Sequence, residues 1–444
     1  MNKTFNRMTK QISLLILLIA LSGLCSAKQN SKTSPFVRIE NGNFLWNNTP
    51  YSYIGTNFWY GAILASEGEG GNRHRLHQEL DYLKKIGINN LRVLVGSDGN
   101  RGITAKVEPT LQIAPGVYND TILAGLDYLL AEMGKRKMVA VLYLNNSWEW
   151  SGGYGQYLEW AGYGKAAVPA VDGWPAYMSY VKQYQQSDSA KALFANYVRD
   201  IITRVNRYTH LKYVDDPAIM SWQIGNEPRA FSDENKPFFA AWIADVAALI
   251  KSLDKNHLVS TGSEGKHGCE EDITLFEKIH ADANVDYMNI HIWPYNWDWV
   301  TKDSLQEKVE LAKENTKKYI DEHLAVAVKY NKPVVLEEFG FPRDGFQFSK
   351  ESSTNVRDNY YAYVFHLIID KTASNRLLPG CNFWGWGGFA NPSTKHIYWK
   401  KGDDYTGDPA QEEQGLNSVF ATDTTVDIIK TANDKLMNKE KIAQ

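Results

Sequence analysis

Two glutamates stand in matching positions far apart in the chain, and together they have the chemistry to cleave a glycosidic bond. Glu227 follows an apolar run that ends in Trp-Gln-Ile-Gly-Asn, and Glu338 follows the run Val-Val-Leu-Glu. Glycosidic cleavage needs one carboxylic acid that protonates the leaving oxygen and a second carboxylate at the anomeric carbon. In retaining enzymes these groups lie about 5–5.5 Å apart. Either glutamate alone could be a solvated loop charge, but the pair predicts a catalytic site.

The two carboxyl groups would need different surroundings. The acid must stay protonated near neutral pH, so its environment must raise its pKa. The nucleophile must stay ionised, which a neighbouring arginine favours. Arg92 lies near the end of another apolar run and could supply that charge, and Asn226 stands directly before Glu227.

The elements that carry these residues alternate between short apolar runs and longer helical patterns. The expected helices cover 76–86, about 123–133, 190–208, 240–253, 274–280, 305–330 and 355–372. The expected strands cover 51–57, 90–95, 138–144, 218–224, 257–261, 287–292, 333–337 and 381–386. This alternation predicts parallel strands with helices between them.

Eight such units predict an α/β fold, a single-domain (β/α)₈ TIM barrel, over residues 28–444. An open doubly wound sheet would usually carry a Gly-rich phosphate loop after its first strand, and no GxGxxG follows residue 57. Barrel chemistry is placed at the C-terminal ends of the strands. The residues there are polar or aromatic: Asn57, Arg92, Asn145, Asn146, Asn226, Glu227, Glu264, His291, Trp293, Glu338 and Trp384.

Residues 1–27 have the pattern of a signal peptide, with a basic start, an apolar run over 12–21 and small residues at the end. We therefore expect secretion to the periplasm or the exterior. Cys25 could instead become a lipidated N-terminal cysteine, which would tether the protein to the outer membrane. The formal net charge of −3 indicates no nucleic-acid partner. No CxxC or HExxH occurs, so we expect neither a metal nor a cofactor.

At these glutamates the chain resembles glycoside hydrolase family 5, and specifically its β-mannanase branch, over roughly residues 36–432. Asn226-Glu227-Pro228-Arg229 and Glu338-Phe339-Gly340 are similar to the family's acid/base and nucleophile motifs. Further similar segments are 145–153, 262–265, 383–388 and 404–420. The resemblance implies a retaining barrel enzyme with Glu227 as acid/base and Glu338 as nucleophile. Strand alternation supports Glu338 over Glu337, because adjacent residues face opposite ways.

The resemblance also implies roles for the neighbouring residues. Arg92 would steady the nucleophile, Asn226 would bind the 2-hydroxyl, and Arg229 would contact the sugar on the leaving side. His291 would lie beside the site, where a core histidine is the alternative, and Trp384 would be a stacking platform. Glu264 and Trp148 are further candidates for substrate binding, although Trp148 could instead pack its loop. Where the family usually has a tyrosine, this chain has Trp293, whose indole N–H can donate one hydrogen bond.

These residues predict an endo-1,4-β-mannosidase-like hydrolase that acts on mannan, glucomannan or galactomannan as a monomer. One alternative keeps the fold and changes the action, to an exo-acting β-mannosidase, a mannobiohydrolase or a β-1,4-glucanase. The insert over 162–187 could block one end of the cleft and favour release from a chain terminus. The other alternative is a surface protein that binds glycans without cleaving them, which would not need both glutamates.

Overall fold

A computed structural model describes residues 34–99, 102, 105–374 and 376–442, and its main compact body begins at Pro35. The expected signal peptide, with Cys25, lies outside the described residues. Among the described helices, none has the length and apolar character needed to cross a membrane.

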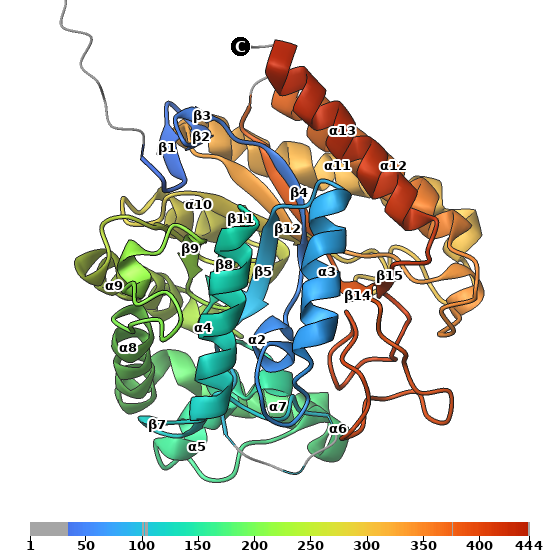
Figure 1. The fold of residues 1–444 in the computed structure, drawn as a ribbon. Helices are drawn as coiled ribbons and strands as arrows, with labels where there is room; N and C mark the ends of the chain where they lie inside the picture. The colour runs from blue at the N-terminus through green and yellow to red at the C-terminus, as the bar shows by residue number, and fades with distance from the viewer. Residues whose placement is uncertain (1–33, 100–101, 103–104, 375, 443–444) are drawn as a thin grey trace, which may run out of the picture. The chain divides into compact units, whose positions relative to one another are not determined.

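A sheet of eight parallel strands forms the centre of this body (Figure 1). Its order is β10-β9-β8-β5-β4-β13-β12-β11. The two edge strands approach each other, since the Asp286 N–H donates to the Val259 carbonyl (2.8 Å) and the His291 N–H to the Glu264 carbonyl (3.2 Å). The sheet is thus nearly closed as a barrel, as the sequence predicts. The strands are β4 (Tyr53–Asn57), β5 (Asn90–Leu94), β8 (Val139–Tyr143), β9 (Ile219–Gln223), β10 (Leu258–Ser260), β11 (Met288–Ile292), β12 (Val334–Phe339) and β13 (Gly380–Phe383).

Helices surround the sheet, and all of the expected ones are present. Several begin where a side chain caps them: Asn119, for example, accepts hydrogen bonds from the Thr121 and Ile122 N–H groups at the start of α4. The helices are α2 (Gly61–Leu64), α3 (Arg73–Lys85), α4 (Asp120–Lys135), α5 (Gly153–Trp160), α6 (Pro169–Asp172), α7 (Trp174–Val181), α8 (Asp188–Ile202), α9 (Lys236–Leu253), α10 (Ile273–Ala281), α11 (Leu305–Tyr330), α12 (Asn355–Ser374) and α13 (Thr425–Ile442).

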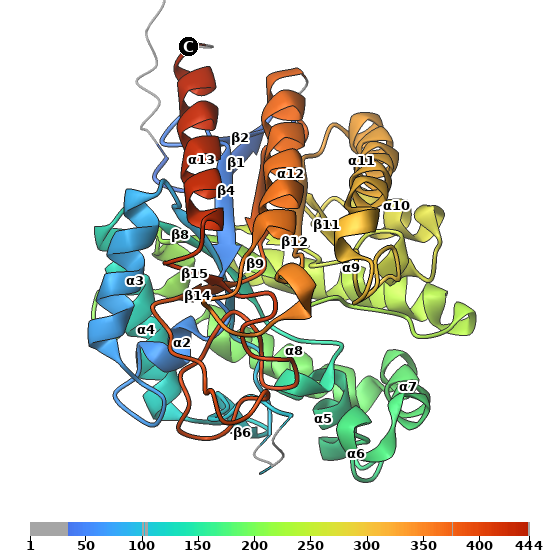
Figure 2. The same ribbon diagram turned by 90° about the vertical axis from the view of Figure 1, so that its right-hand side faces the viewer.

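A small antiparallel sheet covers the N-terminal end of the barrel. It consists of β1 (Arg38–Glu40), β2 (Asn43–Trp46) and β3 (Thr49–Pro50). Phe44 packs edge-to-face on Tyr287, with 5.4 Å between ring centroids, and both belong to the core that fills the barrel interior. Short strand pairs at the other end are β6 (Gln112–Ala114) with β7 (Val117–Tyr118), and β14 (Trp386–Gly388) with β15 (Val419–Phe420). The loops after β8 and between β14 and β15 gather at the end toward which the strands point (Figure 2).

The structure corrects the sequence prediction at two places. The helix expected to reach Tyr208 ends at Ile202. Asn206 explains this difference, because its Oδ1 accepts hydrogen bonds from the backbone N–H groups of Tyr208 and Thr209 and folds the chain into a turn. The strand expected over 381–386 ends at Phe383, and β14 then pairs with β15 instead of continuing in the barrel.

Strand β12 is irregular at the two consecutive glutamates. Leu336 pairs with Ile290 and Glu338 pairs with His291, so Glu337 is an extra residue without its own partner in the register. Strict alternation would aim the two side chains at opposite faces, yet Glu337 and Glu338 both reach Arg92. The alternation argument is therefore wrong for this strand, because a bulge interrupts the pleat.

Buried charges fix the β14–β15 loop. Asp423 accepts hydrogen bonds from Arg343 Nη2 (2.6 and 2.9 Å) and from the Phe420 N–H (2.8 Å). Arg357 lies 3.7 Å from the same carboxylate, and its guanidinium also donates to the carbonyls of Leu416 and Ser418. These contacts join the loop to α12.

We expect Asp423→Ala to lower the free energy of unfolding by about 3–5 kcal/mol, because it leaves buried guanidinium groups without their counter-charge. Urea unfolding followed by circular dichroism measures this change. Asp434→Ala is the matched control: it removes an exposed pair with Lys430 (2.6 Å) and should cost less than about 1 kcal/mol. Equal effects of the two substitutions would contradict the structural role of Asp423.

Candidate active site

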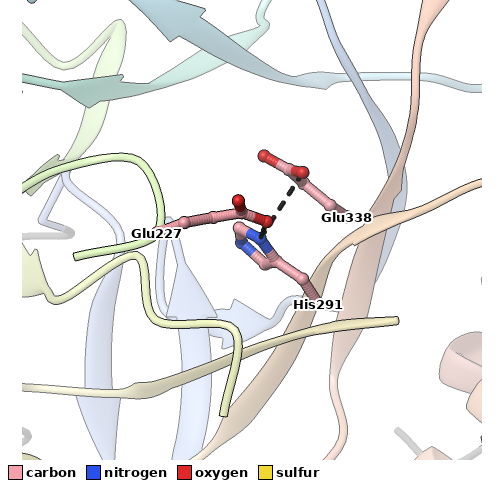
Figure 3. Close-up of side chains that lie close together, drawn as sticks. All are labelled: Glu227, His291 and Glu338. Carbon is pink, nitrogen blue, oxygen red and sulfur yellow. Dashed lines mark hydrogen bonds and ion pairs between the residues drawn. The ribbon is translucent and has the colours of Figure 1, made fainter. Parts of the chain in front are cut away.

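The carboxyl groups of Glu227 and Glu338 face each other across the C-terminal end of the barrel (Figure 3). One oxygen of each, together with a ring nitrogen of His291, lies within 4.8 Å of the others. His291 Nδ1 is 2.8 Å from Glu227 Oε1 and 3.4 Å from Glu338 Oε2. This carboxyl separation suits the retaining geometry of about 5–5.5 Å and not the inverting one of about 6.5–9.5 Å.

Glu338 is held by two donors. Arg92 Nη1 donates to its Oε1, and the indole N–H of Trp293 donates to its Oε2 at 3.2 Å. The indole N–H of Trp293 therefore makes the one hydrogen bond that the sequence predicts it can donate. Both donors favour the ionised form of Glu338.

Arg92, fully buried in β5, organises the floor of the site. Its Nε donates to Gln223 Oε1 (2.8 Å), its Nη2 to Asn226 Oδ1 (2.8 Å) and its Nη1 to Asn57 Oδ1 (3.0 Å). Its guanidinium also lies over the ring of Tyr143, 4.4 Å from the centroid. One side chain thus fixes both Glu338 and the residue before Glu227.

Glu227 follows β9 in a strained backbone conformation, with φ at +50°. Its N–H donates to the Gly262 carbonyl (2.9 Å), which holds this conformation in place. Trp148 Nε1 donates to its Oε2 (2.5 Å), and His291 contacts its Oε1. Both carboxyl oxygens of Glu227 are therefore oriented before any substrate binds.

The two carboxyl groups differ in the charges that surround them. Burial raises the pKa of both Glu227 and Glu338, and the charge of Glu227 raises the pKa of Glu338 further. Arg92 lies directly on Glu338, whereas Arg229, the cation nearest in effect to Glu227, is paired with Glu264 (Nε to Oε2, 2.6 Å). The direct contact with Arg92 favours the ionised form at Glu338, and therefore the protonated form at Glu227. Burial also lowers the pKa of His291 well below its usual value, so this imidazole is neutral.

Trp293→Phe should shift the acidic limb of the pH profile of kcat/KM to higher pH. The indole hydrogen bond lowers the pKa of Glu338, so its loss raises that pKa. An ionised nucleophile then appears only at higher pH. Initial rates on a soluble mannan between pH 4 and 8 check this prediction. Trp299→Phe is the control and should leave the acidic limb unchanged. If the acidic limb of Trp293→Phe also stays at the wild-type pH, the assigned hydrogen bond from Trp293 to Glu338 is contradicted.

The predicted site residues meet in one cavity of about 460 Å³. Arg92 and His291 are buried beneath it. Trp384 lies edge-to-face on Trp293, with 5.9 Å between centroids. The lining contains Trp148, Asn226, Glu227, Arg229, Glu264, Trp293, Glu338 and Trp384.

Sequence reasoning did not single out several other residues around the site. Trp174 comes from the insert at 162–187 and packs edge-to-face on Trp148 (5.9 Å), so part of this insert forms a wall of the cavity. Gln223, the last residue of β9, links Arg92 to Glu337 outside the cavity lining and carries no motif of its own. Gln411 and Glu412 line the cavity from the β14–β15 loop, where no periodic pattern reveals the direction of a side chain.

The cluster of Glu227, His291 and Glu338 also has the spacing of metal ligands. Its atoms are already engaged by Arg92, Trp148 and Trp293. A cation placed there would face the positive charge of Arg92, so we assign this cluster to acid–base chemistry.

The barrel and its facing carboxyl pair define a glycoside hydrolase. The chain belongs to the family described as GH family 5 beta-mannosidase-like, whose sequence profile matches residues 34–441. A crystal structure of a glycoside hydrolase family 5 mannosidase from Rhizomucor miehei superimposes with a TM-score of 0.85 at 32% identity, covering 93% of this chain and all of that one. A variant of it has been solved in complex with mannosyl-fructose, at 31% identity and the same TM-score, covering 93% of this chain and 99% of that one.

Two plant proteins are similar in sequence. Mannan endo-1,4-beta-mannosidase 4 from Oryza sativa is 30% identical over 67% of this chain and 62% of its own length. Mannan endo-1,4-beta-mannosidase 5 from Solanum lycopersicum is 27% identical over 86% of this chain and 89% of its own.

Proposed function

We propose that this protein hydrolyses β-1,4-mannosidic bonds in mannan, glucomannan or galactomannan with retention of anomeric configuration. The observation that carries this proposal is the approach of the Glu227 and Glu338 carboxyl oxygens to within 4.8 Å. At that distance one glycosidic bond fits between an acid and a nucleophile. The space is too small for the water molecule that an inverting enzyme places between its nearer carboxylate and the sugar.

In the first step the Glu338 carboxylate attacks the anomeric carbon, and the bond to the departing oxygen breaks. Glu227 transfers its proton to that oxygen, so the leaving sugar departs as a neutral alcohol. Arg92 and Trp293 hold Glu338 in position for the attack. Asn226 is held by Arg92 and lines the same cavity, and in this proposal it binds the 2-hydroxyl.

In the second step Glu227, now ionised, removes a proton from water, and the resulting hydroxide displaces Glu338 from the anomeric carbon. The two inversions together give net retention. Trp148 and His291 keep both Glu227 oxygens oriented while its charge changes.

The choice of mannose rests on relatives and on the walls of the cavity. The plant relatives are named mannan endo-1,4-beta-mannosidases, and the fungal relative binds mannosyl-fructose. Indole faces at Trp148, Trp174, Trp293 and Trp384 are suited to the apolar faces of pyranose rings.

Proton NMR of the first sugar released tests the proposal. We expect the β-anomer to appear before mutarotation, and turnover of mannohexaose but not of cellohexaose. Release of the α-anomer would overturn the retaining mechanism. Preference for cellohexaose would indicate a β-glucanase, and binding without new reducing ends would indicate a glycan-binding protein.

We further propose that residues 1–27 direct secretion. The mass of the mature protein tests this: cleavage without a lipid supports simple secretion, and a diacylglycerol at Cys25 supports a membrane tether. A full-length chain retained in the cytoplasm would overturn it.

A further inference from the structure

Four side chains that line the cavity each carry a buried polar atom without a hydrogen-bond partner among the described residues. These atoms are Glu412 Oε2, Gln411 Oε1, Glu149 Oε2 and Trp384 Nε1. Most buried polar atoms in proteins are paired, and leaving one unpaired costs about 1–3 kcal/mol. Four such atoms around one cavity indicate a ligand that is rich in hydroxyl groups.

Two of these side chains lie on the Glu338 side of the cavity. Trp384 packs on Trp293, whose indole N–H binds Glu338, and the charge of Glu338 acts on Glu412. Glu149 instead follows Trp148, which binds Glu227, and on that side Arg229 is already paired with Glu264. The unpaired atoms of Trp384 and Glu412 are therefore on the side of the sugar that Glu338 attacks.

The loop that carries Glu412 is fixed in place without a ligand. Gln414 Nε2 donates to the carbonyls of Asp408 (2.9 Å) and Glu412 (3.1 Å). The Asp408 carboxylate accepts hydrogen bonds from the N–H groups of Gly415 (2.8 Å) and Asn417 (3.0 Å). A site built in this way loses little conformational entropy when a sugar binds.

The carboxyl group of Glu412 is suited to hydroxyl groups as a neutral acid. Burial, followed by the charges of Asp408 and Glu338, raises its pKa well above the usual value. A protonated carboxyl group both donates and accepts, as sugar hydroxyls do. Across the cavity, burial raises the pKa of Glu149 to about 7.

The two ends of the cavity differ in extent. On the Glu227 side His267 and Trp297 also line a second cavity of about 330 Å³, so the space continues there. On the Glu338 side Gln411 and Glu412 form the wall. The separate cavity that adjoins Glu149 holds only about 20 Å³, room for about one water. A chain can extend past the leaving group but meets the loop behind the attacked sugar.

We propose that Glu412, with Gln411 and Trp384, binds the hydroxyl groups of a terminal mannosyl residue, so that the enzyme removes mannose from non-reducing chain ends. This inference rests on the proposed hydrolysis of β-mannosides. It assigns to Glu412 the selection of the chain end that is cleaved.

Reducing-end-labelled mannohexaose provides the first test. We expect the wild-type protein to release mannose and to give labelled mannopentaose before any shorter labelled product. A mixture of labelled products from the start would overturn the inference while leaving the proposed hydrolysis intact. Failure to cleave any β-mannoside would instead overturn the proposed function.

Variants at Glu412 provide the second test. Glu412→Ala should lower kcat/KM on mannotriose by about 10- to 100-fold. Glu412→Gln, which still donates and accepts, should recover most of this loss. Glu413→Ala is the matched control, because it lies in the same loop outside the cavity lining. Thermal unfolding checks that each variant is folded.

Deoxygenated substrates show whether Glu412 acts on the sugar itself. 4-Nitrophenyl β-mannosides that lack the 3-, 4- or 6-hydroxyl should react more slowly with the wild-type protein. If Glu412 binds one of these hydroxyls, then removing that hydroxyl from the substrate should slow the Glu412→Ala variant little further. Equal losses in both proteins for all three substrates would contradict direct recognition.

Discussion

Glu338→Ala is expected to reduce kcat on mannan by about four to six orders of magnitude, because no other group can attack the anomeric carbon. The free energy of unfolding should change far less, since the side chain lines a cavity. Rates from reducing-sugar release and far-UV circular dichroism measure the two effects. Substantial remaining turnover by a folded variant would exclude Glu338 as the nucleophile.

Chemical rescue distinguishes Glu338 from the adjacent Glu337, whose carboxyl group binds Tyr287 (3.2 Å) and Gln223 inside the barrel. In Glu338→Ala, azide can enter the vacated space and displace an aryl oxide from an aryl β-mannoside. The product should be the α-mannosyl azide, formed by one inversion. Rescue of Glu337→Ala in its place would reverse the assignment.

Glu227→Gln is expected to lower kcat on mannan by about 10²–10⁴-fold, which is the usual contribution of general acid–base catalysis. A 2,4-dinitrophenyl β-mannoside needs no proton for its first step, so that step should remain fast. The second step still lacks its base, and the covalent intermediate should accumulate. Stopped-flow absorbance should therefore show a burst of dinitrophenolate followed by slow turnover.

The leaving-group dependence is the decisive comparison for Glu227. Equal losses on mannan and on the activated substrate would mean that Glu227 only positions other groups. Trp148→Phe offers a milder companion, since it removes the hydrogen bond to Glu227 Oε2 and keeps an aromatic wall. Its effect should be smaller than that of Glu227→Gln on mannan.

Much of the fold followed from periodicity alone, because the eight buried strands are apolar runs and their ends carry the polar residues. Glu227, Glu338, Arg92 and His291 were identifiable for this reason. Val335 faces the barrel interior, so alternation alone directs Glu337 inward, and the bulge brings Glu338 to the same side. The sequence carried no mark of this bulge, since either pleat register places a glutamate toward the barrel.

Long loops were harder to predict than strands. The position of Glu412 depends on the buried contacts of its loop, which are made by Asp408 within the loop and by Arg357 in α12. Trp174 reaches the cavity from an insert whose course depends on short helices and on packing against Trp148. In both cases tertiary contacts, and not local propensity, direct the side chain.

The left-handed backbone at Glu227 links activity with stability. A non-glycine residue in this conformation carries a strain on the order of 1–2 kcal/mol, which glycine would relieve. Glu227→Gly should thus abolish catalysis without lowering the melting temperature. Laboratory evolution that selects for thermostability alone would tend to discard this glutamate, so a screen for robust variants must include turnover.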